Sequence, residues 1–414
     1  MPRTLTGDVS SPPILYASTA VFLLGALALV VPSGYSIGAV LLLLGSLIWL
    51  WRRPGYELER SDWCIIAVLV AYAAQGMIDA GLRGDGLGDM DRPVRFLLVV
   101  PVLLFLFAYP PRLPALWGGL AVGALTAGAW AGWQKLAEAA VRAGGHTHLI
   151  QYGNLSLMMG FICLAGMGWA INRRYGGWWV LALGLGALGG VLGSVFTGTR
   201  GGWLGLPLLL AVLFWGYGRY LSVKARLGVL ALIIASLAMV YVIPQTGVQD
   251  RIDRAGTELR AYLGGGERSS SVGYRLEMWR GAWQLFLERP VTGWGEQQYV
   301  EQMQAMAGKG VIAPGAGRYN HAHNELLDTA AKQGLVGLGL LLALYLVPLL
   351  LFVGKVRNEH DGINALALAG MLLPLSYLAF GLTQVPMRHN SGVMMYAFWL
   401  VVLWGTLRAT ERTR

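Results

Sequence analysis

Long apolar stretches, each close to the length that crosses a lipid bilayer, dominate this 414-residue sequence. A membrane-spanning helix needs about 20 mostly apolar residues. Charged residues make up only 13% of the chain, against about 25% in a typical soluble domain. The sequence therefore predicts an all-α polytopic membrane protein with about twelve spans. The expected spans are residues 14–31, 36–51, 63–81, 94–109, 114–134, 154–172, 177–196, 202–218, 227–244, 335–353, 362–382 and 391–408.

Lysine and arginine residues in the short loops predict how these spans are oriented. Cytoplasmic loops of membrane proteins carry an excess of basic residues. One set of alternate loops is basic throughout, and both termini fall on the same side because the number of spans is even. We expect this side to be cytoplasmic. Its basic loop residues are Arg52, Arg53, Arg60, Arg112, Arg173, Arg174, Arg219, Lys224, Arg226, Lys355 and Arg357.

The net charge of +10 indicates anionic partners. In a membrane protein these are lipid headgroups or phosphates. No nucleic-acid-binding module is recognisable, so nucleic acid is not expected as a partner.

Residues 245–334 form the longest segment between two expected spans. A segment of that length without structure is uncommon in a compact protein unless it is functional or disordered. We therefore expect three parts: spans one to nine in residues 1–244, an outer cap in residues 245–334, and spans ten to twelve in residues 335–414.

One helix is expected inside the cap, over residues 274–289. Pro290 ends it, and the Gly/Ser-rich stretch 264–273 before it is expected to be a mobile tether. Apolar residues recur along the helix at helical spacing and predict one buried face. These residues are Leu276, Trp279, Trp283 and Phe286.

The polar stretch YNHAHNELLDTAAKQGLVG, residues 319–337, is the strongest candidate for chemistry. Asn320 is a suitable N-cap, which would place His323 at the third helical position. The positive end of a helix dipole disfavours an imidazolium, so His323 is expected to be neutral, as a general base must be. The alternative is that His323 only makes hydrogen bonds within the cap.

Two metal sites are alternative interpretations. His321 and His323 could share an ion on an extended chain, with Glu325 as a third ligand, but on a helix they would point apart. On that helical placement we expect His321 to face away from His323 and assign it no catalytic role. The second set lies in an outer loop and could hold a divalent ion against a pyrophosphate. It consists of Asp85, Asp89 and Asp91.

Arginines on the outer side are candidates for binding phosphate. The planar guanidinium suits bidentate contacts to phosphate oxygens. Arg200 adjoins an apolar span, Arg275 lies on the cap helix, and Arg388 lies in the last outer loop. The alternative is that they reach towards lipid headgroups, as arginines near helix ends commonly do. For three other outer arginines the two interpretations are equally open. They are Arg92, Arg95 and Arg142.

Three segments together resemble one enzyme family. A His–Asn pair, nine residues and Gly–x–x–Gly resemble the pattern of O-antigen ligases, whose superfamily also contains O-antigen polymerases and bacterial protein O-oligosaccharyltransferases. The segment TGTRGGWLG resembles the family's Ser/Thr–x–Arg–Gly step, and YRLEMWRGAWQLFLERPVTGWG resembles its arginine–aromatic helix. The resemblance rests on His323, Asn324, Gly334, Gly337, Arg200, Arg275, Trp279, Pro290, Gly293 and Gly295.

The resemblance implies a metal-independent, inverting glycosyltransferase without a cofactor, with its active site on the periplasmic face of a bacterial inner membrane. The donor would be a glycan on undecaprenyl pyrophosphate, and the acceptor a sugar hydroxyl of lipid A–core oligosaccharide. His323 would be the base, and Arg200, Arg275 and Arg388 would hold the pyrophosphate. Asn324, Trp279, Gly334 and Gly337 would support them.

Other functions remain open from the sequence. An O-antigen polymerase or a protein O-oligosaccharyltransferase would share the donor and differ in the acceptor. A transporter of lipid-linked glycans would place ionisable groups near the middle of the membrane, whereas these spans are nearly free of charge. The glycines Gly334, Gly337 and Gly339 could also serve only to bring membrane helices close together.

Overall fold

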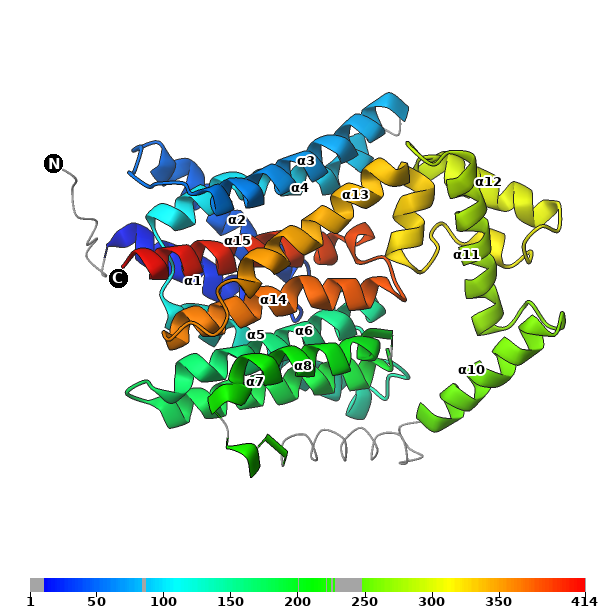
Figure 1. Cartoon of the computed structure of the whole chain (residues 1–414). Helices are drawn as coiled ribbons and strands as arrows, with labels where there is room; N and C mark the ends of the chain where they lie inside the picture. The colour runs from blue at the N-terminus through cyan, green and yellow to red at the C-terminus, as the bar shows by residue number, and fades with distance from the viewer. Residues whose placement is uncertain are drawn as a thin grey trace. The chain divides into compact units, whose positions relative to one another are not determined.

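The structure is a computed structural model that describes residues 11–83, 87–199, 201–220, 222–224, 226–227 and 248–413. All the regular elements in these residues are helices (Figure 1). Eight of the described helices are long and apolar enough to cross a membrane, so the expected all-α polytopic membrane fold is confirmed. Eleven of the twelve expected spans overlap a helix, whereas the range 227–244 lies outside the described residues except for its first residue.

The chain forms two compact units, which we call the membrane unit (residues 1–216 and 339–414) and the cap unit (residues 217–338). The membrane unit begins with α1 (Pro12–Ala26), α2 (Gly34–Leu50), α3 (Arg60–Arg83), α4 (Leu87–Ala108), α5 (Leu113–Leu136), α6 (Leu149–Ile171) and α7 (Gly176–Thr197). It continues with η1 (Gly201–Gly205), α8 (Leu206–Tyr217), α14 (Asp361–Gly381), η5 (Pro386–Arg388) and α15 (Asn390–Arg412). The cap unit contains η2 (Gly218–Tyr220), α10 (Val248–Leu263), α11 (Ser271–Glu288), α12 (Glu296–Gly308) and η4 (Ala316–Arg318). The first residues of α13 (Glu325–Val353) belong to the cap unit and the rest to the membrane unit.

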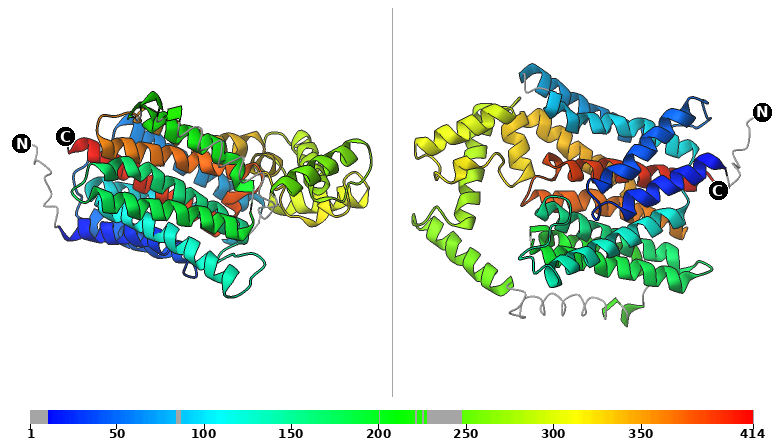
Figure 2. Two further views of the ribbon diagram at one scale, coloured as in Figure 1. Left: turned by 90° about the horizontal axis from the view of Figure 1, so that it is seen from below. Right: turned by 180° about the vertical axis from the view of Figure 1, so that it is seen from behind.

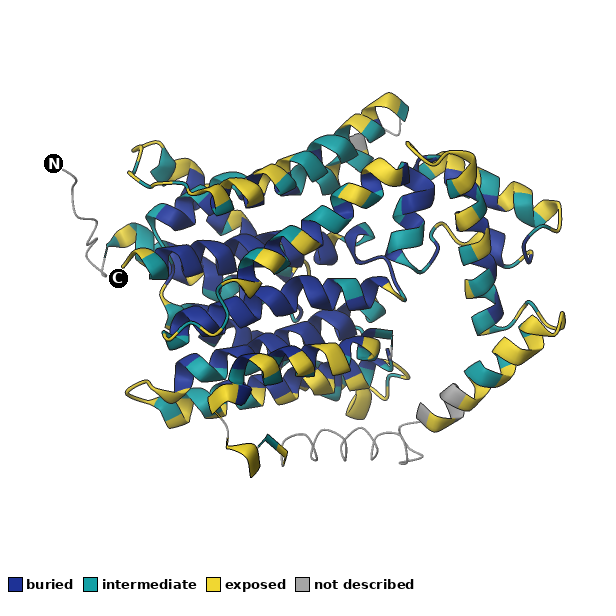
Figure 3. Cartoon of the chain, in the orientation of Figure 1, coloured by how far each residue is buried: buried dark blue, intermediate teal, exposed yellow. Residues whose placement is uncertain are grey.

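Helix α15 is the centre of the membrane unit, and nearly every residue along it is buried (Figure 3). A helix that is apolar on all sides is suited to such a position. Two hydrogen bonds join it to neighbouring helices. The Tyr396 hydroxyl donates to the Leu344 carbonyl at 2.6 Å, and the Tyr377 hydroxyl of α14 donates to the Gly392 carbonyl at 2.6 Å.

Helices α1, α5 and α7 approach one another closely at glycines, in the part of the unit coloured blue to green in Figure 2. A Cβ atom on Gly123 would lie 2.0 Å from the Gly25 carbonyl oxygen, and one on Gly128 would lie 2.4 Å from the Gly189 carbonyl oxygen. A side chain at these positions would clash with the neighbouring backbone, so the contacts require glycine. Helices in a membrane associate through tight packing of this kind and not through the exclusion of water.

Several basic loops meet at one end of the membrane unit. Arg408 is joined to Asp62 at 3.1 Å, and Lys355 is joined to Glu411 at 2.7 Å. The Asn172 amide, in a neighbouring loop, donates to Asp361 at 2.6 Å. We call this end, with the C-terminus of α15, the basic end.

The Asp62–Arg408 pair offers a test of what holds the basic end together. The Asp62 side chain is 0% exposed and that of Arg408 is 3% exposed, and the Trp404 indole also donates to Asp62 at 2.9 Å. Removing one member of a buried ion pair costs about 3–5 kcal/mol, because the other charge stays buried. We expect Arg408→Met to lower the thermal stability of the detergent-purified protein by an amount in this range.

The matched control is Arg95→Met, which removes an arginine whose side chain is 16% exposed from its pair with Asp91, whose side chain is 56% exposed. An ion pair that water reaches contributes about 0–1 kcal/mol. Equal melting temperatures for the two variants would show that the buried pair does not stabilise the unit.

Candidate functional site

Helix α13 begins later than the sequence predicts, and Asn324 is its N-cap. The Asn324 side-chain oxygen accepts hydrogen bonds from the backbone N–H groups of Leu326 and Leu327, each at 3.1 Å. The predicted cap at Asn320 and the predicted helical position of His323 are therefore wrong. The side-chain oxygen of Asn320 instead lies 2.8 Å from His321 Nδ1. Both asparagines are suitable caps by type, and contacts from residues later in α13 and from α11 hold the loop before Asn324.

Side chains from two helices hold the loop 320–323 through hydrogen bonds to the backbone carbonyl and the backbone N–H of Ala322. The Trp279 indole of α11 donates to the Ala322 carbonyl at 3.0 Å. The Ala322 N–H donates to the Asp328 carboxylate of α13 at 2.8 Å. Ala322 is itself completely buried. The backbone immediately before His323 is thus fixed by α11 and α13 together.

His323 adopts a left-handed backbone conformation, with a φ of +50°. This region is uncommon for residues other than glycine and costs of order 1–3 kcal/mol, and such strain clusters at functional sites. The His323 ring is 4.1 Å from the His321 ring and 5.5 Å from the Tyr319 ring, between centroids. The expectation that His321 faces away is therefore wrong, because the segment is not helical.

A buried ion network lies under the same loop. Lys332 is only 5% exposed at its side chain and pairs with Asp328 at 2.8 Å and with Glu296 at 3.2 Å. Its ammonium group also donates to the Asn320 carbonyl at 2.9 Å. Our sequence reasoning overlooked Asp328 and Lys332. The available signal was an acid and a base four residues apart inside the nine residues between Asn324 and Gly334, a spacing that pairs them on a helix.

Arg275 and Trp279 lie one turn apart on α11, so they share a side of the helix. The Arg275 side chain is accessible at the surface. Partial desolvation lowers its pKa, while its electrostatic interaction with Tyr319 raises the pKa. Since Tyr319 also contacts the His323 ring, the cap unit brings Arg275, Trp279, His323 and Asn324 into one region.

The packed face of α11 differs from the predicted one. Its buried residues include Met278, Ala282 and Leu285, which join the core of the cap unit with Tyr299 and Met303 of α12. The predicted face was wrong for Leu276, Trp283 and Phe286, which are not part of this core, whereas the predicted Trp279 packs against it.

Two of the larger aromatic residues of α11, Trp283 and Phe286, lie outside this core. The Trp283 side chain is 49% exposed and contacts the Phe286 ring at 5.3 Å. The helix also starts at Ser271, inside the expected tether, because Ser270 caps it by accepting from the Gly273 N–H at 3.0 Å.

Glu277 is the buried acid of α11 and joins three segments of the cap unit. Its side chain is 0% exposed and pairs with Arg268. It also accepts from the Tyr262 hydroxyl at 2.5 Å and from the Ala313 N–H at 2.7 Å. Burial raises the pKa of Glu277, but these hydrogen bonds outweigh it and hold the pKa below its ordinary value of 4.5.

This lowered pKa predicts an acid-sensitive cap unit. Stability linked to a carboxyl with a lowered folded-state pKa is present above the unfolded pKa and is lost as the pH falls through the folded value. We expect wild-type protein to lose thermal stability as the pH falls below 4.5, and Glu277→Gln to lack most of this dependence. Glu288→Gln, at an exposed position of α11, should keep the wild-type profile. If wild type and Glu277→Gln have the same pH profile, Glu277 is not the group responsible.

Two glycine-containing turns of the cap unit interlock. Gly334, with φ +64° and ψ −159°, interrupts the helical path of α13. A Cβ atom on Gly334 would lie 2.2 Å from the Val291 carbonyl oxygen, and one on Gly293 would lie 2.3 Å from the Lys332 carbonyl carbon. Backbone hydrogen bonds join the same two segments, from the Leu335 N–H to the Pro290 carbonyl at 2.7 Å and from the Gly295 N–H to the Lys332 carbonyl at 2.8 Å.

These contacts revise the interpretation of the motif glycines as helix-packing residues. Gly334 packs against the turn after α11, and a Cβ atom on Gly337 would meet the side chain of Gln333. Gly339 has no atom within 4 Å of its Cβ position among the described residues.

We expect Gly334→Ala to destabilise the cap unit by about 2 kcal/mol or more, because alanine fits neither the backbone conformation nor the space. Thermal unfolding of the purified protein measures this. The control is Gly339→Ala on the same helix, which should be neutral or slightly stabilising because that position is helical and open. Similar melting temperatures for the two variants would refute the interlock.

The other predicted arginines belong to the membrane unit. Arg200 lies outside the described residues. Arg388, in η5, is partly buried, and its carbonyl accepts from the Arg92 guanidinium at 3.2 Å. Burial and, next, the charge of Arg92 lower the pKa of Arg388 to about 10, while Asp89 raises it. Arg388 therefore remains a cation at neutral pH.

The alternative acidic metal site is not assembled by the described residues. Asp89 pairs with Arg92 at 3.2 Å, and Asp91 pairs with Arg95, while Asp85 lies outside the described residues. Among the described residues no three His, Cys, Asp or Glu side chains gather as metal ligands.

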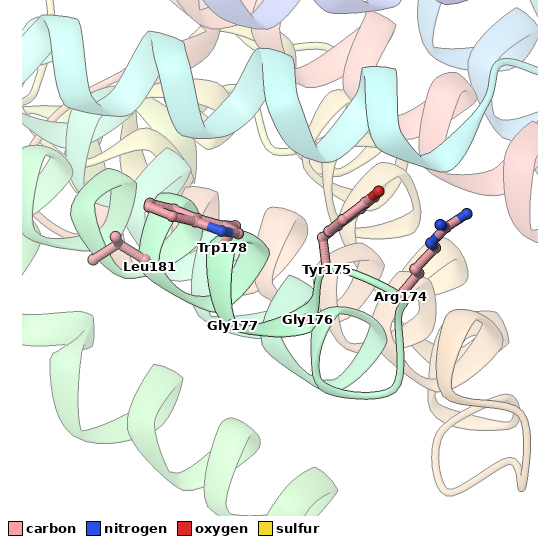
Figure 4. A pocket seen from close by; sticks show the side chains of 6 residues that line it. All are labelled: Arg174, Tyr175, Gly176, Gly177, Trp178 and Leu181. Atoms are coloured by element: carbon pink, nitrogen blue, oxygen red, sulfur yellow. The ribbon is translucent and has the colours of Figure 1, made fainter.

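An open pocket at the start of α7 contains none of the predicted site residues (Figure 4). It is lined by Arg174, Tyr175, Gly176, Gly177, Trp178 and Leu181.

Comparison with known proteins identifies relatives of this chain. Residues 185–342 match the O-antigen ligase family. An uncharacterized protein of Haemophilus influenzae is 24% identical over 370 residues, which cover 89% of this chain and 92% of that protein. An O-antigen ligase of Escherichia coli is 27% identical over 202 residues, 48% of this chain and 47% of that protein. The family match contains α11, the loop 320–323 and the first part of α13.

Proposed function

Because the chain belongs to the O-antigen ligase superfamily through residues 185–342, we propose that it transfers an O-antigen glycan from undecaprenyl pyrophosphate to a sugar hydroxyl of lipid A–core. The superfamily indicates a glycosyltransferase of ligase or polymerase type. The observation that carries the proposal is the strained His323, held by contacts from α11 and α13 in the region that also contains Arg275.

His323 is the proposed general base. It would accept the proton of the acceptor hydroxyl while that oxygen attacks the anomeric carbon of the donor glycan. A positioned base of this kind contributes about 10²–10⁴-fold to a rate. His323 lies just before the first turn of α13, where the positive end of the helix dipole disfavours the charged imidazolium. This favours the neutral form that can accept a proton.

Arg200, Arg275 and Arg388 are proposed to bind the leaving pyrophosphate. As the bond from the anomeric carbon to the pyrophosphate oxygen breaks, that oxygen takes the electron pair and its negative charge grows. Preorganised cations aimed at developing charge are often the largest catalytic contribution. Because the acceptor displaces the pyrophosphate in one step, the anomeric configuration should invert. No metal or other cofactor is needed for this step.

Supporting roles follow from contacts in the cap unit. Trp279 positions the loop before His323 through Ala322, and Asn324 starts α13 directly after it. Gly334 and Gly337 shape the kink of α13. Asp328 and Lys332 hold the loop from below, so we propose them as positioning residues. The segment 245–334 would thus be the catalytic cap.

We propose the bacterial inner membrane as the location, with both termini cytoplasmic and the site facing the periplasm. The meeting of basic loops and the C-terminus at the basic end supports this orientation. The partners would be the lipid-linked donor, the lipid A–core acceptor and membrane lipid, and not nucleic acid.

The proposal predicts large losses of transfer for two variants. His323→Ala should lower the rate about 10²-fold or more, and Arg275→Ala should lower it by a similar factor. The assay is transfer from a defined undecaprenyl-pyrophosphate glycan to purified lipid A–core in vitro, with and without chelator. Arg280→Ala is the control, because Arg280 is an exposed arginine of the same helix.

Full activity of both variants would refute the proposed roles, and inhibition by chelator would refute the metal-independent step. Transfer to glycan chains or to protein, with none to lipid A–core, would identify a polymerase or a protein O-oligosaccharyltransferase instead. A product with retained anomeric configuration would contradict single displacement.

A further inference from the structure

Two buried carboxamide side chains near the start of α6 lack hydrogen-bond partners among the residues that the structure describes. Gln151 and Asn154 are each 1% exposed. The structure gives no partner to the amide nitrogen or the amide oxygen of either residue. More than about 90% of buried backbone polar groups, and most buried side-chain ones, are paired in native structures, and an unpaired one costs stability. Four unpaired atoms on one helix face therefore call for a functional explanation.

The two amides face a specific part of the membrane unit. Gln151 and Asn154 are three residues apart, so they are neighbours on one face of α6, and His148 is the N-cap residue just before the helix. The His148 ring lies 4.8 Å from the His389 ring. A Cβ atom on Gly202 would lie 2.4 Å from Asn154 Oδ1 and 3.2 Å from Phe380. The face therefore points to the segments 201–202 and 380–389.

These two segments also meet each other, and they contain polar residues. A Cβ atom on Gly201 would lie 2.2 Å from Thr383 Oγ1. Gln384 is buried, and Arg388 follows in the same segment as a partly buried cation. In the sequence, Gly201 and Gly202 directly follow Arg200. The unpaired amides thus lie beside the segments that carry two of the proposed pyrophosphate-binding arginines.

The hydrogen-bond donors and acceptors of a carboxamide indicate which class of ligand it can bind. Each amide offers two N–H donors and one carbonyl acceptor. Phosphate oxygens at neutral pH mainly accept hydrogen bonds, so a phosphate would leave both amide oxygens unpaired. Sugar hydroxyls donate and accept, and can satisfy both ends of each amide.

We propose that Gln151 and Asn154 bind the sugar hydroxyls of the lipid-linked donor, at the sugar nearest the pyrophosphate. The inference rests on the proposed function, because it assumes a donor with a sugar joined to a lipid pyrophosphate. Both side chains are covered in this structure, so binding requires the segment 201–202 to move aside. The two amides would then select the donor by its first sugar, while the proposed arginines bind the negatively charged pyrophosphate.

Ser156 provides a matched control on the same helix. Its hydroxyl is also fully buried and without a partner. It faces α7 instead, where a Cβ atom on Gly193 would lie 2.9 Å from it. Ser156→Ala thus removes an unpaired buried polar group of α6 away from the proposed subsite.

The test compares two lipids with the full-length protein in detergent or nanodiscs. One is undecaprenyl pyrophosphate that carries a single hexose, and the other is undecaprenyl pyrophosphate without sugar. The variant combines Gln151→Met and Asn154→Leu, which keep side-chain volume and remove the amides. We expect its affinity for the hexose-bearing lipid to fall about tenfold or more, since several neutral hydrogen bonds are lost.

Three further results are expected if the amides bind sugar. The variant should bind the sugar-free lipid as wild type does. Its melting temperature should stay the same or rise, because unpaired buried amides are removed. Ser156→Ala should leave both affinities unchanged. If the double variant does not yield folded protein, Gln151→Met alone is compared in the same way.

Other outcomes overturn the inference. Equal losses for both lipids would assign the amides to the pyrophosphate or to the shape of the site. A lower melting temperature with both affinities unchanged would assign them a structural role, such as holding an internal water. Wild-type protein that binds neither lipid would instead refute the proposed function itself.

Discussion

The close approach of two backbones at Gly334 is the contact on which the candidate site depends. The turn after α11 reaches the kink of α13 only because neither Gly334 nor Gly293 has a side chain. That approach places α11 against the start of α13, where Trp279 reaches Ala322. Without it, the loop before His323 would lose its contact from α11 and keep only the contacts from α13. The position of His323 therefore depends on the same backbone contact that requires the glycines.

The sequence predicted elements that depend on local pattern and missed those that depend on contacts between segments. Apolar runs located the described membrane helices because their length is a property of the bilayer. The choice between Asn320 and Asn324 as N-cap was not predictable, because Asp328 and Lys332 decide it by binding the loop from a later part of the chain. The prediction of which side of α11 packs against the core was wrong for a similar reason. Tyr299 and Met303 of α12 pack against the side of α11 that carries Ala282. The periodicity of residues within α11 does not show which side α12 will cover.

In the candidate site, too, local pattern was predictable from the sequence and contacts between segments were not. Spacing predicted His323, Asn324 and Gly334 as one motif, which stays a prediction, and the structure places Arg275 and Trp279 of α11 in the region of His323 and Asn324. The relation between His321 and His323 required the backbone conformation, since a helix would have separated the rings and the left-handed φ of His323 does not. The ion network of Lys332 was visible only as a spacing of four residues, and nothing in the sequence indicated that Glu296 would complete it or that the Tyr299 ring would lie 4.7 Å from the Lys332 ammonium group.

Buried polar groups in the membrane unit include paired and unpaired ones. At the basic end, Asp62 and Arg408 are buried and paired with each other, and Asp62 also accepts from Trp404. At the start of α6, Gln151 and Asn154 are buried just as deeply and engaged with nothing that the structure describes. A membrane interior makes unpaired polar groups costly, so a chain that only needed stability would carry apolar side chains at both positions. Their place beside the segment of Arg388 fits the proposed donor-binding surface, where sugar hydroxyls would supply the hydrogen bonds that the described residues do not.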